Sequence, residues 1–311
     1  MKKKVVAVIL TAALAAGVLS ACGSTQESGA QEGAAAETES AAQEETPAET
    51  ESAAQEETAS ETESVEAKGT ITVAATSVPH AEILEAAKPI LAQQGWDLQV
   101  TEFQDYVQPN EVVEAGDFDA NYFQHTPYLN SFNEEKGTHL VSVGEIHYEP
   151  LGIYSGTGAD LANIEDGAEV AIPNDTTNEA RALLLLQDNG LITLKEGAGI
   201  EATVNDIAEN PHNIKFNELE AAQVSRVLPE VAFVVLNGNY ALEAGLNAQD
   251  DALAIETSDS EAAKTYVNVI VVKEGNEENE GVKALVDVLK SDEIKQFIND
   301  TYQGSVVPFE G

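Results

Sequence analysis

Strand-type and helix-type segments begin to alternate at residue 70, and this alternation constrains the fold more than any other feature of the chain. The run Thr70–Ala75 (TITVAA) is typical of a strand. Apolar residues then follow at helical spacing from Pro79 to the stop at Gly95, and Trp96–Phe103 (WDLQVTEF) alternates as a second strand. A strand, a helix and a strand in this order begin a parallel, doubly wound sheet. The sequence therefore predicts an α/β fold.

The alternation starts again near residue 169, which predicts two lobes. Glu169–Ile172 is a short apolar run, and a helical pattern over Ala180–Gln187 stops at Asn189 and Gly190. Further expected strands are 118–120, 139–143, 147–154, 214–218, 231–236 and 267–273, and further expected helices are 110–115, 279–290 and 292–299. We assign residues 69–149 and 242–311 to lobe one and 150–241 to lobe two, with a ligand cleft between them at the carboxyl ends of the strands. A single large α/β domain remains the alternative.

The N-terminus has the features of a lipoprotein signal. Lys2, Lys3 and Lys4 precede an uncharged, Ala-rich stretch that ends at Leu19-Ser20-Ala21-Cys22. This pattern predicts a signal peptide over residues 1–21, cleavage before Cys22 and a lipid anchor on that cysteine. An uncleaved membrane helix is the alternative. Cys22 is the only cysteine of the chain, so no disulfide and no catalytic thiol are possible in the folded part.

Residues 22–68 have the composition of a spacer. The segments Glu37–Thr46 and Glu49–Thr58 are identical, and apart from Pro47 no apolar residue larger than alanine occurs between Gly23 and Ser64. Such a segment cannot bury a core, and its glutamates repel one another. The whole chain carries a formal net charge of -40, which argues against nucleic acid or an anionic membrane surface as a partner.

One polar turn in this acidic chain contains an arginine. Arg181 is one of two arginines, and it ends the sequence Pro173-Asn-Asp-Thr-Thr-Asn-Glu-Ala-Arg at an expected strand-to-helix turn. Backbone N–H groups and a guanidinium at such a turn can bind a carboxylate or a phosphate. The alternative is that Asp175, Thr176, Thr177 or Asn178 caps the helix and that Arg181 forms a surface ion pair.

Three segments together resemble a known family. They are Asp105–Asn110, Gly116–Leu129 and Pro173–Arg181 with the apolar residues behind it. With Tyr266-Val267-Asn268 and the strand that runs into Asn237-Gly238-Asn239-Tyr240, they resemble the methionine-binding lipoproteins of the MetQ/NlpA family over essentially all of 70–311. The resemblance implies a two-lobe periplasmic-binding-protein fold of type II and a substrate-binding component of an ABC importer, held on the outer face of the cell membrane. A Gram-positive surface is our expectation.

The resemblance also implies the roles of individual residues. Four side chains of lobe one would form the wall around the ligand side chain, namely Tyr106, Phe123, His125 and Tyr128. Arg181 would bind the ligand carboxylate, and Asn178 and Asn237 would hydrogen-bond its carboxylate and amino groups. Asn239 could replace Asn237, because Gly238 and Asn239 depart from the family pattern as we know it. Aromatic edges suit a thioether independently of the resemblance.

Several functional alternatives stay open at this stage. Within the same class, the ligand could be D-methionine or a methionine-containing dipeptide in place of L-methionine. The other classes are a surface scaffold or adhesin and an enzyme for a small anion. We expect no enzyme, because no nucleophile–base arrangement is found, and we expect no cofactor. We expect no metal site either, because His80, His139, His147 and His212 are scattered without ligand spacing. The expected partners are the ligand, a membrane permease and its ATPase.

Overall fold

The computed structural model describes residues 66–257 and 264–311. The predicted signal peptide, the lipidated Cys22 and the spacer up to residue 65 lie outside the described residues. Within the described ranges, no helix is both long enough and apolar enough to cross a membrane.

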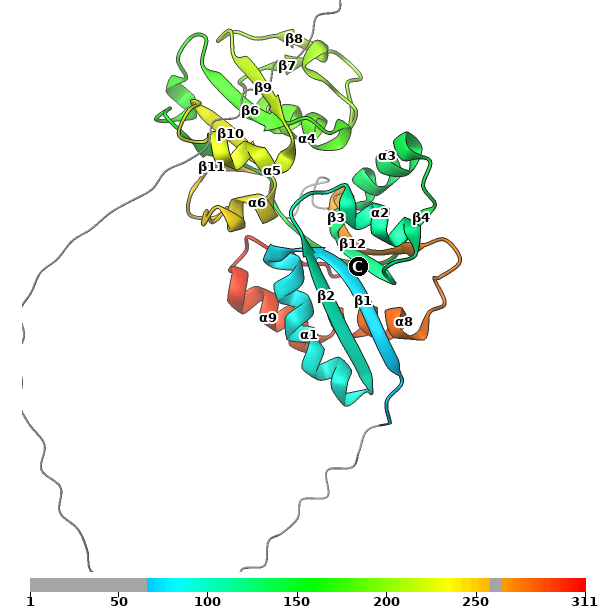
Figure 1. Cartoon of the computed structure of the whole chain (residues 1–311). Coiled ribbons are helices and arrows are strands. Elements are labelled where there is room, and N and C mark those ends of the chain that lie inside the picture. The colour runs from blue at the N-terminus through cyan, green and yellow to red at the C-terminus, as the bar shows by residue number, and fades with distance from the viewer. Residues whose placement is uncertain (1–65, 258–263) are drawn as a thin grey trace, which may run out of the picture. The chain divides into compact units, whose positions relative to one another are not determined.

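The first of two main sheets contains the predicted strand–helix–strand unit. Its strands are β1 (Gly69–Thr76), β2 (Trp96–Phe103), β3 (Ala120–His125), β4 (Leu140–Tyr148), β12 (Val267–Lys273) and β13 (Val307–Pro308). The strand order is β13-β4-β12-β3-β1-β2, with β1 parallel to β2 and β3, and β12 antiparallel to β3 and β4. The parallel start of the sheet is thus as predicted, and antiparallel strands complete it (Figure 1).

The second main sheet has five strands in the order β11-β5-β10-β6-β9. They are β5 (Gly152–Ser155), β6 (Glu169–Pro173), β9 (Lys215–Leu219), β10 (Phe233–Leu236) and β11 (Ala252–Ile255). A small separate sheet pairs β7 (Thr193–Leu194) with β8 (Ile207–Glu209). The predicted boundary at residue 242 would assign β11 to lobe one, whereas β11 pairs with β5 in the second sheet. We keep the division into two lobes as a proposal.

Helices cover both faces of the first sheet and bury it. The α-helices of the described residues are α1 (Glu82–Gln93), α2 (Gln108–Ala115), α3 (Thr126–Lys136), α4 (Thr176–Asp188), α5 (Ala221–Val224), α6 (Gly238–Glu243), α8 (Glu280–Leu289) and α9 (Asp292–Tyr302). A π turn spans Ser77–Ala81, and 3-10 turns span Leu161–Asn163, Val204–Asp206 and Ser225–Val227. Apolar residues of α1, α8 and α9 pack with β1 in one cluster, and those of α2 and α3 pack with β12 in another. Every residue of β3 is buried between these layers.

Two connections join the two sheets, and both carry a glutamate: the chain passes from β4 to β5 through Glu149 and from β11 back toward β12 through Glu256. A further polar segment leaves β10 through Asn237, enters α6 and returns to β11 of the second sheet. The strand expected over 147–154 is interrupted, because β4 ends at Tyr148 and β5 begins at Gly152. Pro150 lies in the gap, and its missing N–H cannot take part in a strand ladder.

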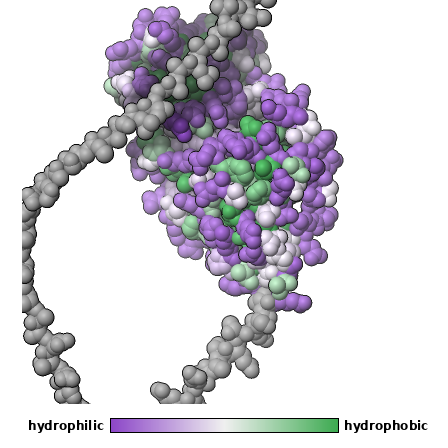
Figure 2. Space-filling view, viewed as in Figure 1, coloured by the Kyte–Doolittle hydropathy of each residue, from purple (hydrophilic) through white to green (hydrophobic). Residues whose placement is uncertain are grey.

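Several short elements differ from the sequence prediction. The helices α3, α5 and α6 and the strands β7, β8, β11 and β13 were not predicted, and the short strand expected at 118–120 is β3, which begins at Ala120. The polar residues of α3 interrupt its apolar spacing, so that its helical period is weak. The space-filling view shows mostly hydrophilic residues with scattered apolar ones on its visible face, as expected for so acidic a chain (Figure 2).

Candidate functional site

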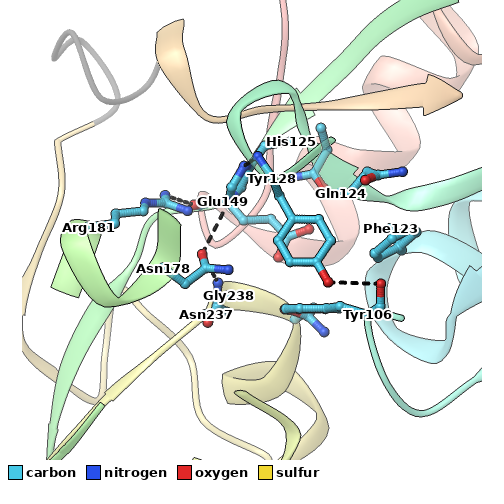
Figure 3. A pocket seen from close by; sticks show the side chains of 12 residues that line it. Tyr106, Phe123, Gln124, His125, Tyr128, Glu149, Asn178, Arg181, Asn237 and Gly238 are labelled. Atoms are coloured by element: carbon cyan, nitrogen blue, oxygen red, sulfur yellow. Dashed lines mark hydrogen bonds between the residues drawn. The ribbon is translucent and has the colours of Figure 1, made fainter. Parts of the chain in front are cut away.

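All seven residues that the sequence analysis selected line one cavity. This cavity has an empty volume of about 330 Å³, part of it open to solvent. Figure 3 shows how its side chains converge, and they come from β3 and β12 of the first sheet, from α3, α4 and α6, and from the connecting segments that contain Tyr106, Glu149 and Asn237. The lining residues are Tyr106, Phe123, Gln124, His125, Tyr128, Glu149, Asn178, Arg181, Asn237, Gly238, Asn239 and Asn268.

Three aromatic rings form one wall of the cavity, and we call them the aromatic wall. Tyr106 precedes α2, Phe123 lies on β3, and Tyr128 lies in the first turn of α3. The ring centroids of Tyr106 lie 5.7 Å from those of Phe123 and of Tyr128. The Tyr128 hydroxyl donates to the backbone oxygen of Tyr106 at 3.1 Å, which fixes the two rings relative to one another. Such a wall offers flat apolar faces and ring edges to a ligand side chain.

His125 connects the aromatic wall to the opposite side of the cavity. Its Nδ1 accepts the backbone N–H of Tyr128 at 3.2 Å, so its proton is on Nε2, which donates to Asn178 Oδ1 at 3.2 Å. Burial, together with the nearby charge of Arg181, lowers the pKa of His125 to about 3. His125 is therefore a neutral donor at neutral pH.

A chain of amide side chains continues from His125 and ends in an unpartnered oxygen. Asn178 Nδ2 donates to Asp175 Oδ1 at 2.8 Å, and Asn178 Oδ1 also accepts from Asn237 Nδ2 at 2.8 Å. This orientation leaves Asn237 Oδ1 buried with no hydrogen-bond partner. Asn239 Oδ1 accepts from the Tyr106 hydroxyl at 2.5 Å, and in this orientation of the amide its Nδ2 is buried without a hydrogen-bond partner. Buried polar groups without a partner are costly, and a bound ligand is a common way to satisfy them.

Arg181 is buried and already has an acidic partner of its own chain. Its Nε donates to Glu256 Oε1 at 2.9 Å, and its Nη2 donates to Glu256 Oε2 at 2.5 Å and to the backbone oxygen of Glu149 at 2.9 Å. Burial lowers the pKa of Arg181, but Glu256 outweighs that effect and raises it above the ordinary value. No hydrogen bond of Nη1 is found among the described residues. The surface ion pair considered from the sequence is therefore wrong, since the Arg181 side chain is 4% exposed.

The capping interpretation of the polar turn is confirmed for Asp175. Asp175 is the N-cap of α4, and its Oδ1 accepts the backbone N–H of Asn178 at 3.1 Å. Burial raises the pKa of this carboxyl to about 6. Asp175 therefore occupies the start of α4. The cationic side chain that lines the cavity from this helix is that of Arg181.

Several lining residues were missed by the sequence analysis. Glu149 had a weak signal as a charged residue between an expected strand and Pro150. Gln124 lies beside the selected Phe123, and Gly238 beside Asn237. Asn268 belongs to the Tyr266-Val267-Asn268 stretch of the family resemblance, but no role in the site was assigned to it. His80 and His147, expected to be scattered, lie together with Glu149 next to the cavity, with their ligand-type atoms within 4.8 Å of one another.

The fold has two β-sheets, each packed with helices, which are joined by crossing segments. A polar and aromatic cavity is lined by strands of the first sheet and by helices that pack with the second. These features define a substrate-binding protein of the periplasmic type. The chain belongs to the NlpA lipoprotein family, whose model matches residues 71–310. A crystal structure of a putative lipoprotein from Ruminococcus gnavus is 70% identical, with a TM-score of 0.77 over 78% of this chain and 99% of that one.

Two further relatives carry names that refer to a ligand. A nutrient-binding protein from Burkholderia cenocepacia, solved bound to methionine, is 43% identical with a TM-score of 0.73 over 76% of this chain and 99% of that one. The methionine-binding lipoprotein MetQ of Bacillus subtilis is 39% identical over 78% of this chain and 88% of its own length. These structures confirm the predicted class of fold, and the family is one of binding proteins.

Proposed function

We propose that this protein is the substrate-binding lipoprotein of an ABC importer and that it binds methionine. The observation that carries the proposal is the pair of unpartnered atoms, Asn237 Oδ1 and Asn239 Nδ2, in a cavity with an aromatic wall. One atom is an acceptor and the other a donor, which is what the two ends of an amino acid require.

The cationic side of the cavity supports binding of the ligand carboxylate. Asn239 Nδ2 is a buried donor without a partner, and no hydrogen bond of Arg181 Nη1 is found in the described part of the chain. A hydrogen bond that involves a charged group contributes roughly 1.5–3 kcal/mol, so this contact would dominate the orientation of the ligand. In this arrangement Asn178 orients Asn237 through its hydrogen bond and has a supporting role.

The aromatic wall supports a long, unbranched and polarizable side chain. Contacts between sulfur and an aromatic edge contribute about 0.3–1.5 kcal/mol each, and Tyr106, Phe123 and Tyr128 present both faces and edges. The protein would do no chemistry. It would close around methionine and deliver it to a permease and its ATPase, with Cys22 as the lipid anchor on the outer face of the membrane.

The test is calorimetric titration of L-methionine into purified protein that has been unfolded and refolded to remove bound ligand. We expect one-to-one binding, and a loss of about 2–5 kcal/mol in Arg181→Ala. The matched control is Arg226→Ala, which changes the only other arginine, on an exposed turn. Normal binding of methionine by Arg181→Ala would contradict the assignment of the site.

Competition experiments separate the ligands that share this chemistry. D-methionine and a methionine-containing dipeptide are titrated against bound L-methionine. Tighter binding of either would change the ligand and leave the class of protein intact. Binding of no amino acid and no dipeptide would favour a scaffold. For the anchor, Cys22→Ser should release the protein from the membrane fraction.

A further inference from the structure

Three buried residues behind the cavity form a cluster that the proposed carboxylate and side-chain subsites do not use. His80 lies in the turn between β1 and α1, His147 lies on β4, and Glu149 follows β4. Their exposed fractions are 1%, 0% and 5%. Glu149 also lines the cavity, so the cluster reaches the ligand through this one carboxyl group.

The Nε2 atoms of both histidines lie close to one oxygen of Glu149. His147 Nε2 is hydrogen-bonded to Glu149 Oε1 at 2.7 Å, and His80 Nε2 is hydrogen-bonded to Asn268 Oδ1 at 3.1 Å and lies 3.3 Å from Glu149 Oε1. The Nδ1 atoms on the far sides of both rings are bonded to hydroxyls, of Thr76 for His80 and of Tyr122 for His147. When these hydroxyls donate to Nδ1, each histidine carries its proton on Nε2, so that His147 donates to Glu149 and His80 donates to Asn268 beside it.

This arrangement stabilises a carboxylate with neutral donors. Burial lowers the pKa of His80 to about 4 and that of His147 to about 3, so neither ring is charged at neutral pH. Burial also raises the pKa of Glu149, and His80, Arg181 and the backbone N–H of Asn239 offset only part of that shift. When Glu149 is ionised, its charge has hydrogen-bond donors but no cation of its own among the described residues, because Glu256 already matches the charge of Arg181.

Gly238 brings a second acceptor close to this carboxylate. A Cβ atom at residue 238 would lie 2.7 Å from the Cβ and 2.9 Å from Oε2 of Glu149, so only glycine allows the chain to approach so closely. The neighbouring residue is Asn237, whose Oδ1 is unpartnered. A carboxylate and a free amide oxygen therefore both line the cavity, and a positively charged donor with several N–H groups could satisfy the two acceptors together.

We propose that Glu149 binds the α-ammonium group of the ligand, with Asn237 Oδ1 as its second acceptor, and that His80 and His147 are positioning residues that orient the carboxylate. This assignment rests on the proposed function, since it presumes that the ligand is an amino acid. It divides the cavity into an ammonium end at Glu149 and Asn237 and a carboxylate end at Arg181 and Asn239.

A divalent metal ion is the other cation that two histidines and a carboxylate could hold. The geometry favours the ammonium group. Two ligands of a tetrahedral zinc ion, with bonds of about 2.0–2.1 Å, lie roughly 3.3 Å apart. The distance of 2.7 Å between His147 Nε2 and Glu149 Oε1 is instead that of a direct hydrogen bond.

The experiment compares L-methionine with 4-(methylthio)butanoate, the same molecule without its amino group, in the wild-type protein and in Glu149→Gln. We expect Glu149→Gln to lose at least about 30-fold in affinity for methionine and less than about threefold for the amine-free acid. The matched control is Glu145→Gln, which changes an exposed glutamate on the preceding strand β4 and should alter neither affinity. His147→Leu should also reduce the ratio of the two affinities, and His147→Gln, which keeps a donor, should reduce it less.

Four outcomes would overturn the assignment. Equal affinities of the wild-type protein for methionine and for the amine-free acid would overturn it. This measurement needs no variant, so it holds even if Glu149→Gln fails to fold. An equal loss for both ligands in Glu149→Gln would reduce Glu149 to a packing role. Zinc-dependent stabilisation of the wild type, reversed by EDTA and absent in Glu149→Gln, would make the cluster a metal site. Binding of neither ligand by the wild type would reject the proposed function itself, and the ammonium assignment with it.

Discussion

The two sides of the cavity differ in how complete they are without a ligand. The rings of the aromatic wall pack on one another and on apolar residues of α2, α3 and β12, so their contacts are already made. The polar side, formed by Asn178, Arg181, Asn237 and Asn239, leaves an acceptor and a donor unpartnered. We infer that the aromatic wall belongs to the folded core, whereas the polar side gains its last contacts from the ligand.

This difference separates folding from binding. Substitutions in the aromatic wall should lower the free energy of unfolding, because they remove contacts that the protein makes by itself. Substitutions at the unpartnered atoms should lower ligand affinity and leave the free energy of unfolding nearly unchanged, because the protein alone gains nothing from these atoms. The ion pair between Arg181 and Glu256 is the exception on the polar side, since it is complete without a ligand.

The largest effect on stability should come from Glu256→Ala. Glu256 accepts two hydrogen bonds from Arg181 and others from the Tyr148 hydroxyl and the Leu151 N–H. Its removal leaves a buried guanidinium without a counterion, which costs about 3–5 kcal/mol in the free energy of unfolding. Urea unfolding without ligand measures this, with the exposed Glu274→Ala as control. A loss below about 1 kcal/mol would show that water reaches Arg181.

Phe123→Ala tests the aromatic wall directly. Phe123 is 3% exposed on β3 and packs with Tyr106 and Tyr128. We expect a loss of about 2–4 kcal/mol in the free energy of unfolding, somewhat less than for a fully packed phenylalanine because one side faces the cavity. Urea unfolding of the ligand-free variant measures it. If the variant lost methionine binding but kept the free energy of unfolding of the wild type, the aromatic wall would not belong to the folded core. Its rings would then contribute only to contacts with the ligand.

Acid should destabilise the ligand-free protein through its buried histidines. The pKa values of His80, His125 and His147 are lowered to about 4, 3 and 3, so below pH 6.5 the unfolded chain binds protons that the folded one does not. Stability is therefore fully present above pH 6.5 and falls as the pH falls. The raised pKa of Asp175 acts in the opposite direction.

We expect a net loss of about 1–3 kcal/mol between pH 6.5 and pH 5.5, measured by urea unfolding at both values. His139→Gln, which changes an exposed histidine, should follow the same curve as the wild type. A constant or rising stability on acidification would show that the three rings are already charged or open to solvent in the folded protein.

The smallest effect on stability, and a clear one on binding, should come from Asn237→Ala. This variant removes the unpartnered Oδ1 together with one hydrogen bond to Asn178. Calorimetry should show methionine affinity reduced by about 1–3 kcal/mol, while the free energy of unfolding without ligand changes by less than about 1 kcal/mol. A large loss of stability at unchanged affinity would place Asn237 with the core.

Local patterns were sufficient for much of the fold and for part of the cavity. The strand–helix–strand start, β12 and the C-terminal helices follow from periodicity, because one face of each element is buried by its immediate neighbours. Phe123 and His125 share one side of β3 because side chains alternate along a strand, as their spacing indicated. The helix α3 could not be predicted in the same way, since its polar residues interrupt the period.

The partnerships of charged and polar groups were decided only by the tertiary structure. The sequence by itself determined that Arg181 ends a polar turn before a helix and that His80 and His147 are separate residues without ligand spacing. Only the folded chain brings Glu256 onto Arg181 and both histidines onto Glu149. The physical reason is that secondary structure depends on neighbours a few residues apart. A buried charge instead depends on whichever donors the crossing segments bring within hydrogen-bond distance.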